Sequence, residues 1–298
     1  MVYHIPALLH ESIDGLNIRP DGIYVDVTFG GGGHSMEILK RLKNGRLIAF
    51  DQDADTRINV PADDRFLFLD QNFRFLKNNL RFNGIGSIDG LIADLGVSFH
   101  QFDKTERGFT FRQDAPLDMR MNESSKITAA HLLKTLDETA LADIFYRYGE
   151  LTNSRRIAKE IVKARNLKPL TSVNGIIDAI GRLAPFRQEH KFYARVFQAL
   201  RIAVNHEIDY LQEMLEQSLD VLNHGARLVV ITYHSLEDRV VKNFMKSGNF
   251  EGVENKDFYG NVETPFRLIN RKGSTPGKEE IANNNRARSA RLRIAEKI

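Results

Sequence analysis

The chain has 298 residues, with 42 lysines and arginines against 39 aspartates and glutamates and a formal net charge of +3. It has no cysteine, which excludes disulfides, thiolate nucleophiles, cysteine-ligated zinc and iron–sulfur clusters. No apolar run approaches the ~20 residues of a membrane helix. The N-terminus shows no leader pattern, and the nine histidines show no metal-ligand spacing. We therefore expect a cytoplasmic protein of about two domains with no membrane partner and no metal.

Strand and helix signals alternate along the first 96 residues. Strands rich in β-branched and aromatic residues are predicted at 23–29, 46–51, 65–69 and 89–95. Helical spacing of apolar residues marks 35–42 and 73–82 between them. Such alternation in short units predicts a parallel sheet with right-handed crossovers.

The alternation stops after the fourth strand. Residues 97–122 contain many turn formers and little periodicity, and a loop of this length is typical of a functional segment that closes over a site. From residue 128 to about 222 the signals are helical, including one long stretch at 194–222. Strand character returns at 227–233.

The C-terminal part resumes the α/β pattern. Helical spacing follows the fifth strand, and residues 266–269 and 290–295 are expected to form a terminal β pair. The stretch 273–285 between them is rich in Gly, Pro and Asn and is expected to be mobile. We predict a discontinuous α/β domain of residues 1–122 and 223–298, with residues 123–222 as an inserted all-helical domain.

A glycine turn follows the first strand. Residues 30–33 are four consecutive glycines before a helix, a place where backbone N–H groups can approach a ligand closely. Asp51 ends the second strand, 21 residues after Gly30, where an acidic residue can accept hydrogen bonds from a ribose diol. The pair predicts an adenosine-containing ligand and fits NAD or S-adenosylmethionine equally. Asp51 alone could be a solvated carboxylate at the end of a strand.

Two further strand ends carry polar groups. Asp94 ends the fourth strand, so its carboxylate should lie at the same edge as the glycine turn, where it could accept an N–H of an exocyclic amine. His234 follows the fifth strand and should lie beside it. Ser235 with Asp238 three residues later also fits a helix cap, and the two interpretations are compatible.

Basic residues gather in two blocks. Residues 145–205 hold 12 basic and 4 acidic side chains, and residues 267–298 hold 9 and 3, within an otherwise acidic chain. This pattern favours a polyanionic partner, although solvated helix faces would look the same. The candidate RNA-binding residues are Arg155, Arg156, Lys159, Lys191, Tyr193, Arg195, Arg286 and Arg288.

With these motifs in place, the sequence resembles the MraW/RsmH family of bacterial methyltransferases, which act on N4 of a cytidine in small-subunit (16S) ribosomal RNA. The resemblance runs over nearly the whole chain, from His4 onwards. Its most specific motifs are Asp94-Leu95-Gly96-Val97-Ser98, Pro116-Leu117-Asp118-Met119-Arg120-Met121 and His234-Ser235-Leu236-Glu237-Asp238-Arg239.

The resemblance implies a class I, Rossmann-like methyltransferase sheet that uses S-adenosylmethionine, with the small-subunit rRNA or the small ribosomal subunit as partner. It implies an RNA-recognition role for the helical insertion and leaves a homodimer open. Cofactor contacts are implied at Gly32, Gly33, His34, Asp51, Phe73, Asp94 and Gln101. Direct in-line transfer is expected, with Asp94 as first and His234 as second candidate for the group that accepts the amine proton.

The sequence also departs from the family pattern. Gly31 replaces a commonly basic or polar residue, and Phe99-His100 replaces a Ser-Pro pair. His190-Lys191-Phe192-Tyr193 departs from a His-Pro-Ala pattern. Two other classes stay open: a non-enzymatic RNA-binding ribosome-assembly factor, and an NAD-dependent dehydrogenase, which would share the glycine turn and Asp51.

Overall fold

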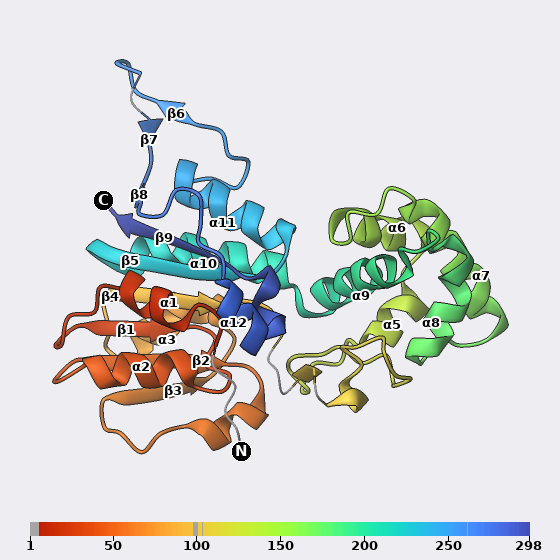
Figure 1. The fold of residues 1–298 in the computed structure, drawn as a ribbon, viewed down its shortest axis with the longest axis horizontal. Helices are drawn as coiled ribbons and strands as arrows, with labels where there is room; N and C mark the ends of the chain where they lie inside the picture. Colours follow the sequence, from red (N-terminus) through yellow and green to blue (C-terminus); the bar gives the residue numbers. More distant parts are fainter. Residues whose placement is uncertain (1–5, 98–100, 103, 261) are drawn as a thin grey trace. The chain divides into compact units, whose positions relative to one another are not determined.

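The structure is a computed structural model that describes residues 6–97, 101–102, 104–260 and 262–298. It contains two compact units (Figure 1). The sheet unit comprises residues 1–96 and 208–298, and the helical unit comprises residues 97–207. Within the described residues, no helix is long and apolar enough to cross a membrane.

The sheet unit is built on seven strands in the order β3-β2-β1-β4-β5-β9-β8. The first five of these are parallel, and β9 runs antiparallel to both of its neighbours. The strands are β1 (Ile23–Asp26), β2 (Arg46–Asp51), β3 (Phe66–Asp70), β4 (Ile88–Asp94), β5 (Leu222–Thr232), β8 (Phe266–Leu268) and β9 (Arg291–Lys297). The predicted Rossmann-like α/β fold and the terminal β pair are confirmed.

The central strands are apolar without alternation because both faces of the sheet are covered. Residues Leu47 to Phe50 of β2, for example, have no exposed surface. The chain order reverses between β1 and β4, which lie side by side with Val25 opposite Leu91. Ligands of open α/β sheets bind at the carboxyl ends of the strands beside such a reversal.

Helices pack on the sheet through their apolar faces. The helices α1 (Leu9–Gly15) and α2 (Gly33–Arg41) share a core with β1, β4 and β5 and lie in front of the sheet in Figure 1. The helices α3 (Leu76–Phe82) and α10 (Glu207–Val221) are joined where Lys77 N donates to Gln217 Oε1 at 2.9 Å. The unit also contains α11 (Ser235–Ser247), α12 (Lys278–Asn283), β6 (Asn255–Lys256) and β7 (Val262–Glu263).

The helical unit has its own hydrophobic core, centred on fully buried side chains such as Phe145, Ile161 and Leu200. Side chains of Thr128, Asp137 and Ser172 cap three of its helices, as sequence preferences at helix N-termini predict. The helices are α5 (Ala129–Thr135), α6 (Glu138–Arg147), α7 (Ser154–Leu167), α8 (Val173–Ile180) and α9 (Glu189–Asn205). Short 3-10 turns complete the two units at Ala54–Asn59, Phe73–Phe75, Thr105–Arg107, Gly181–Leu183 and Asn285–Ser289.

The division between the units differs from the expected boundaries of residues 123–222. The expected loop belongs to the helical unit because Phe109, Leu117 and Met119 are buried in the core of that unit. Asn205 of α9 holds this segment by donating to Met119 O at 2.8 Å and accepting from Met121 N at 2.7 Å. The specific motif at 116–121 is therefore a folded part of the helical core.

Two other expectations need correction. The single helical stretch at 194–222 is two helices, because His206 adopts a left-handed conformation with φ of 52° and ends α9. The stretch 273–285 contains α12, whose Glu280 side chain accepts a hydrogen bond from Leu8 N at 2.7 Å. This long-range contact gives the stretch a fixed partner that its composition did not reveal.

Candidate active site at the carboxyl edge of the sheet

The glycine turn is shaped by two residues with positive φ. Gly30 and Gly32 have φ of 52° and 79°, which glycine adopts without strain, and Gly32 is the N-cap of α2. A Cβ atom added at Gly31 would meet nothing within 4 Å, so the turn is open there. A Cβ at Gly33 would lie 2.3 Å from the Pro6 ring. Gly33 is therefore required by packing within the protein, and Gly31 marks the open side of the turn.

Asp51 is bonded directly to this turn. Its Oδ2 atom accepts a hydrogen bond from Gly30 N at 2.8 Å, and its Oδ1 atom accepts one from Asp53 N at 2.8 Å. Burial raises the pKa of the Asp51 carboxyl to about 7, against the lowering effect of these two bonds. The structure thus brings the two predicted halves of the adenosine site together.

Asp26, at the end of β1, was not among the predicted site residues. It is 1% exposed and accepts hydrogen bonds from Ser35 Oγ at 2.7 Å and Thr28 N at 3.0 Å. Burial raises the pKa of this carboxyl also. The sequence signal that could have identified Asp26 was its position as the only acidic residue of β1. Asp26 fixes both ends of the turn, because Thr28 precedes the glycines and Ser35 follows them.

Asp94 lies at the end of β4 and is held by residues from three other segments. Its Oδ1 atom accepts a hydrogen bond from the Tyr233 hydroxyl at 2.9 Å, and its backbone N–H donates to Thr28 Oγ1 at 2.6 Å. Its Oδ2 atom lies 3.9 Å from His34 Nδ1. Burial is the main reason why the pKa of Asp94 rises to about 7, and the charges of Asp26 and Glu237 add to it. The carboxylate therefore sits at the shared strand edge, as predicted.

His34 lies in the first turn of α2 and is 5% exposed. Burial lowers the pKa of its imidazole to about 4, so the ring is neutral at pH 7 and forms no full ion pair with Asp94. Its Nε2 atom has no hydrogen-bond partner among the described residues. A neutral, buried ring beside the glycine turn is suited to packing against a bound ligand.

His234 follows β5, as predicted, and is the N-cap of α11. Its Nδ1 atom accepts a hydrogen bond from Glu237 N at 3.3 Å and caps α11, while Tyr233 is the neighbour that bonds Asp94. A helix cap is therefore present as predicted, but its N-cap residue is His234 and not Ser235. Tyr233 is the residue beside Asp94 that sequence reasoning missed.

The residues implied only by the family resemblance are placed as follows. Phe73 begins the short turn after β3 and is half-buried, which leaves part of its ring available. Gln101 is 5% exposed within the helical unit. His4, Ser98, Phe99 and His100 lie outside the described residues.

The three carboxyls at this edge all have raised pKa values. Asp26 raises the pKa of both Asp51 and Asp94 by charge repulsion. Among the described residues, no lysine or arginine forms an ion pair with any of the three. A ligand that carries positive charge and hydroxyl donors would satisfy them, and S-adenosylmethionine, with its sulfonium, ammonium and ribose diol, fits this description.

The first basic block of the helical unit lies mainly on α7. Arg155, Arg156 and Lys159 are all exposed, and Lys163 continues the same helix face one turn later. Their apolar neighbours Ile157 and Ile161 are fully buried, so the helix is amphipathic with a basic outer face. This exposed face is the arrangement that the sequence predicted.

The segment 190–195 of α9 is less available than its composition indicated. Lys191 is exposed, but Phe192 is buried, and Tyr193 packs on Phe111 and Phe192 with ring centroids 6.2 Å and 5.5 Å away. Arg195 is partly buried. The alternation of charge and aromatic groups therefore reflects one amphipathic helix, and most of the aromatic surface is used in folding.

An exposed aromatic residue nearby was missed. Phe186 is 81% exposed, and the Arg187 guanidinium lies 5.2 Å from its ring centroid. It follows Pro185 in the turn before α9, and an apolar residue beside Pro and Arg was the available signal. In the sheet unit, Arg286 and Arg288 are exposed on the turn Asn285–Ser289, as predicted.

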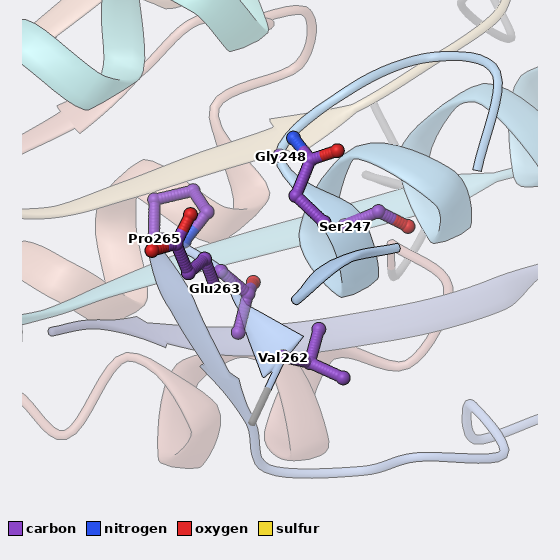
Figure 2. A pocket seen from close by; sticks show the side chains of 7 residues that line it. Ser247, Gly248, Val262, Glu263 and Pro265 are labelled. Carbon is purple, nitrogen blue, oxygen red and sulfur yellow. The ribbon is translucent and has the colours of Figure 1, made fainter. Parts of the chain in front are cut away.

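Two hollows open at opposite ends of α11, which is about 20 Å long at 1.5 Å per residue. One of about 540 Å³ lies at its C-terminal end, where Ser247 and Gly248 face Val262, Glu263 and Pro265 beside β7 (Figure 2). It is remote from the carboxyl ends of the parallel strands. The other, of about 380 Å³, lies at the N-terminal end beside Tyr233.

The chain matches the model of the MraW methylase family over residues 1–298. It is 58% identical over 298 residues to a ribosomal RNA small subunit methyltransferase H from Parabacteroides distasonis, covering 99% of this chain and 98% of that protein. Proteins of the same name from Flavobacterium johnsoniae and Cytophaga hutchinsonii are 53% and 52% identical, covering 100% and 99% of this chain and 99% and 100% of theirs. Among solved structures, an rRNA methylase from Streptococcus thermophilus has a TM-score of 0.44 at 14% identity, with 99% of both chains covered, a likeness too weak to assign a ligand.

Proposed function

Because the chain belongs to the MraW methylase family and uses S-adenosylmethionine, we propose that it methylates the exocyclic N4 of a cytidine in small-subunit ribosomal RNA. The observation that carries this proposal is the edge where Asp26, Asp51 and Asp94 gather beside an open glycine turn. Asp26 is buried and the other two are partly buried, and all three carboxyls have raised pKa values. The names of the relatives support the rRNA substrate. The family resemblance supports the target atom.

The sheet unit would hold the cofactor through residues of three strand ends. Asp51 would accept hydrogen bonds from the ribose diol, and Gly31 and Gly32 would let the backbone approach closely. Phe73 and the neutral ring of His34 would pack against apolar parts of the ligand. The bound cofactor supplies a methyl group already activated by a sulfonium charge.

Asp94 would act on the amine of the target base. An exocyclic amine conjugated with a pyrimidine ring is a weak nucleophile, and a carboxylate that accepts one of its N–H bonds increases its electron density during attack. The pKa of about 7 matches a group that also takes the proton released when the N–C bond forms. Tyr233 would position the carboxylate through its 2.9 Å hydrogen bond, and transfer would be in-line and direct.

The basic face of α7 and the exposed ring of Phe186 would bind the RNA. Arg155, Arg156 and Lys159 offer charge to phosphates, and an exposed aromatic ring offers a surface for an unpaired base. These groups sit in the helical unit, so that unit would recognise the substrate. Arg286 and Arg288 would add phosphate contacts from the sheet unit.

The decisive experiment is transfer of a radiolabelled methyl group from S-adenosylmethionine. Small ribosomal subunits and naked 16S rRNA, both from cells that lack the enzyme, are incubated with the protein, and the RNA is digested to nucleosides. We expect label in N4-methylcytidine from at least one of the two substrates. Label in another nucleoside would overturn the target atom, and no label in either substrate would favour a non-enzymatic assembly factor.

A further inference from the structure

The hollow at the N-terminal end of α11 has a cationic lining. It has a volume of about 380 Å³ and lies entirely within the sheet unit. Its charged lining side chains are Lys242, Arg291, Arg293 and Asp238, which leaves two positive charges in excess. The remaining lining residues are Thr232, Tyr233, His234, Ser235 and Ser289.

The charged side chains of this cavity differ in whether they already have a partner. Arg293 is 6% exposed and forms a two-pronged pair with Asp238, with Nε–Oδ1 and Nη2–Oδ2 distances of 2.6 Å and 2.8 Å. Arg291 lies 4.0 Å from the same carboxylate, and its side chain is 42% exposed. Lys242 is exposed and has no hydrogen bond or ion pair with another described residue. Asp238 is therefore paired with Arg293. Arg291 donates one hydrogen bond, from Nη1 to Lys272 O at 3.1 Å, which leaves its Nη2 group, together with Lys242, available to a ligand.

The location of the cavity connects it with both the reacting edge and the basic C-terminal block. Tyr233 lines the cavity and also donates its hydroxyl hydrogen bond to Asp94. Ser289, on another wall, ends the turn that carries the exposed Arg286 and Arg288. The first turn of α11 adds the positive end of a helix dipole at Ser235. Tyr233 therefore links this cavity directly with Asp94, the candidate acceptor.

We propose that this cavity binds a backbone phosphodiester of the substrate RNA close to the target nucleotide, with Lys242 and Arg291 as its ligands. This inference rests on the proposed RNA substrate. Two cations that converge beside hydroxyl groups match the charge and the acceptor oxygens of a phosphodiester. Because the contact lies beside Asp94, it orients the target nucleotide as well as adding affinity.

The test compares two lysines of the same helix. Lys242→Gln removes a cavity cation, and Lys246→Gln removes an equal charge from a residue that pairs with Glu254 at 2.7 Å outside the cavity. Binding of labelled 16S rRNA is measured by filter retention from 50 to 300 mM salt, without methyl transfer. We expect Lys242→Gln to weaken binding about fivefold to tenfold and to reduce the slope of log K against log salt by about 0.7–1, as for one lost phosphate contact.

Further variants and a measurement with inorganic phosphate distinguish the possible outcomes. Arg291→Gln should also reduce the slope of log K against log salt, and Lys246→Gln should leave this slope unchanged. Affinity for S-adenosylmethionine and thermal stability should stay at wild-type values in all three variants. Equal binding by Lys242→Gln and Lys246→Gln would overturn the proposal. So would stabilisation by inorganic phosphate that depends on Lys242 without any change in RNA binding, because the cavity would then take a free anion.

The binding measurement also distinguishes this inference from the proposed function. If wild-type protein binds rRNA with a Lys242-dependent salt slope but transfers no methyl group, the phosphate site stands and the enzymatic proposal fails. If wild-type protein methylates rRNA and Lys242→Gln binds rRNA as the wild type does, the enzymatic proposal stands and the phosphate site fails.

Discussion

The two units use charge in opposite ways. The sheet unit gathers Asp26, Asp51 and Asp94 at one edge, with Asp26 buried and the other two partly buried, and desolvation raises all three pKa values. The helical unit exposes Arg155 and Lys159 on α7, where water and salt screen them. Buried charges give strong, short-range discrimination of a small ligand, and exposed charges give salt-dependent attraction to a polyanion. We therefore expect ligand binding by the two units to respond to different experimental variables.

The largest expected effect is on kcat, and it comes from Asp94 at the carboxyl edge of the sheet. Asp94→Asn keeps the shape of the side chain but removes the carboxylate, so kcat at saturating S-adenosylmethionine should fall about 10²–10⁴-fold, the usual contribution of a general base. Tyr233→Phe should lower kcat less, because the carboxylate remains, and should shift the pH–rate profile. Methyl transfer and cofactor affinity are measured separately. Full turnover by Asp94→Asn once cofactor is saturating would reduce Asp94 to a binding residue.

An intermediate effect is expected on the exposed face. Replacing Arg155, Arg156 and Lys159 together by Gln should raise the KM for rRNA about tenfold or more and reduce its salt dependence, since each phosphate contact contributes about 0.7–0.9 to the slope. Affinity for S-adenosylmethionine, measured by calorimetry, should change little. Replacing the exposed Arg81 of α3 by Gln gives a control for the loss of one charge in the other unit, to be compared with the single Arg155→Gln variant. Parallel losses of RNA and cofactor binding would contradict the separation of the two units.

The smallest expected effect is a pH dependence of cofactor binding. The pKa values of Asp51 and Asp94 are raised to about 7, so both carboxyls are mostly protonated at pH 6 and mostly ionised at pH 8. A cationic ligand prefers the ionised forms, so its affinity should rise a few-fold between pH 6 and pH 8, with proton release on binding. Calorimetry in buffers of different ionisation enthalpy measures this release. Affinity that is flat over this range would show that the carboxyls are already ionised without ligand.

Much of the site could be predicted because it depends on local order. The glycines follow β1, and β1 lies between β2 and β4 in this sheet, so the acids that end β2 and β4 flank the glycine turn. For this reason Asp51 and Asp94 could be identified from the sequence. Tyr233 was missed because its role depends on which side of an extended segment it faces. Phe186 and Lys242 were missed because exposure and cavity lining are not periodic in the sequence.

The sequence by itself determined the α/β class, the glycine turn, the helical insertion and the family, because each depends on periodicity or on motifs that are local in the chain. Only the tertiary structure decided which side chains form hydrogen bonds and ion pairs with one another. It placed the Tyr233 hydroxyl on Asp94, made His234 a helix cap, and committed Asp238 to Arg293 across 55 residues. Such pairings depend on burial and distance between remote segments, and those quantities exist only after the chain has folded.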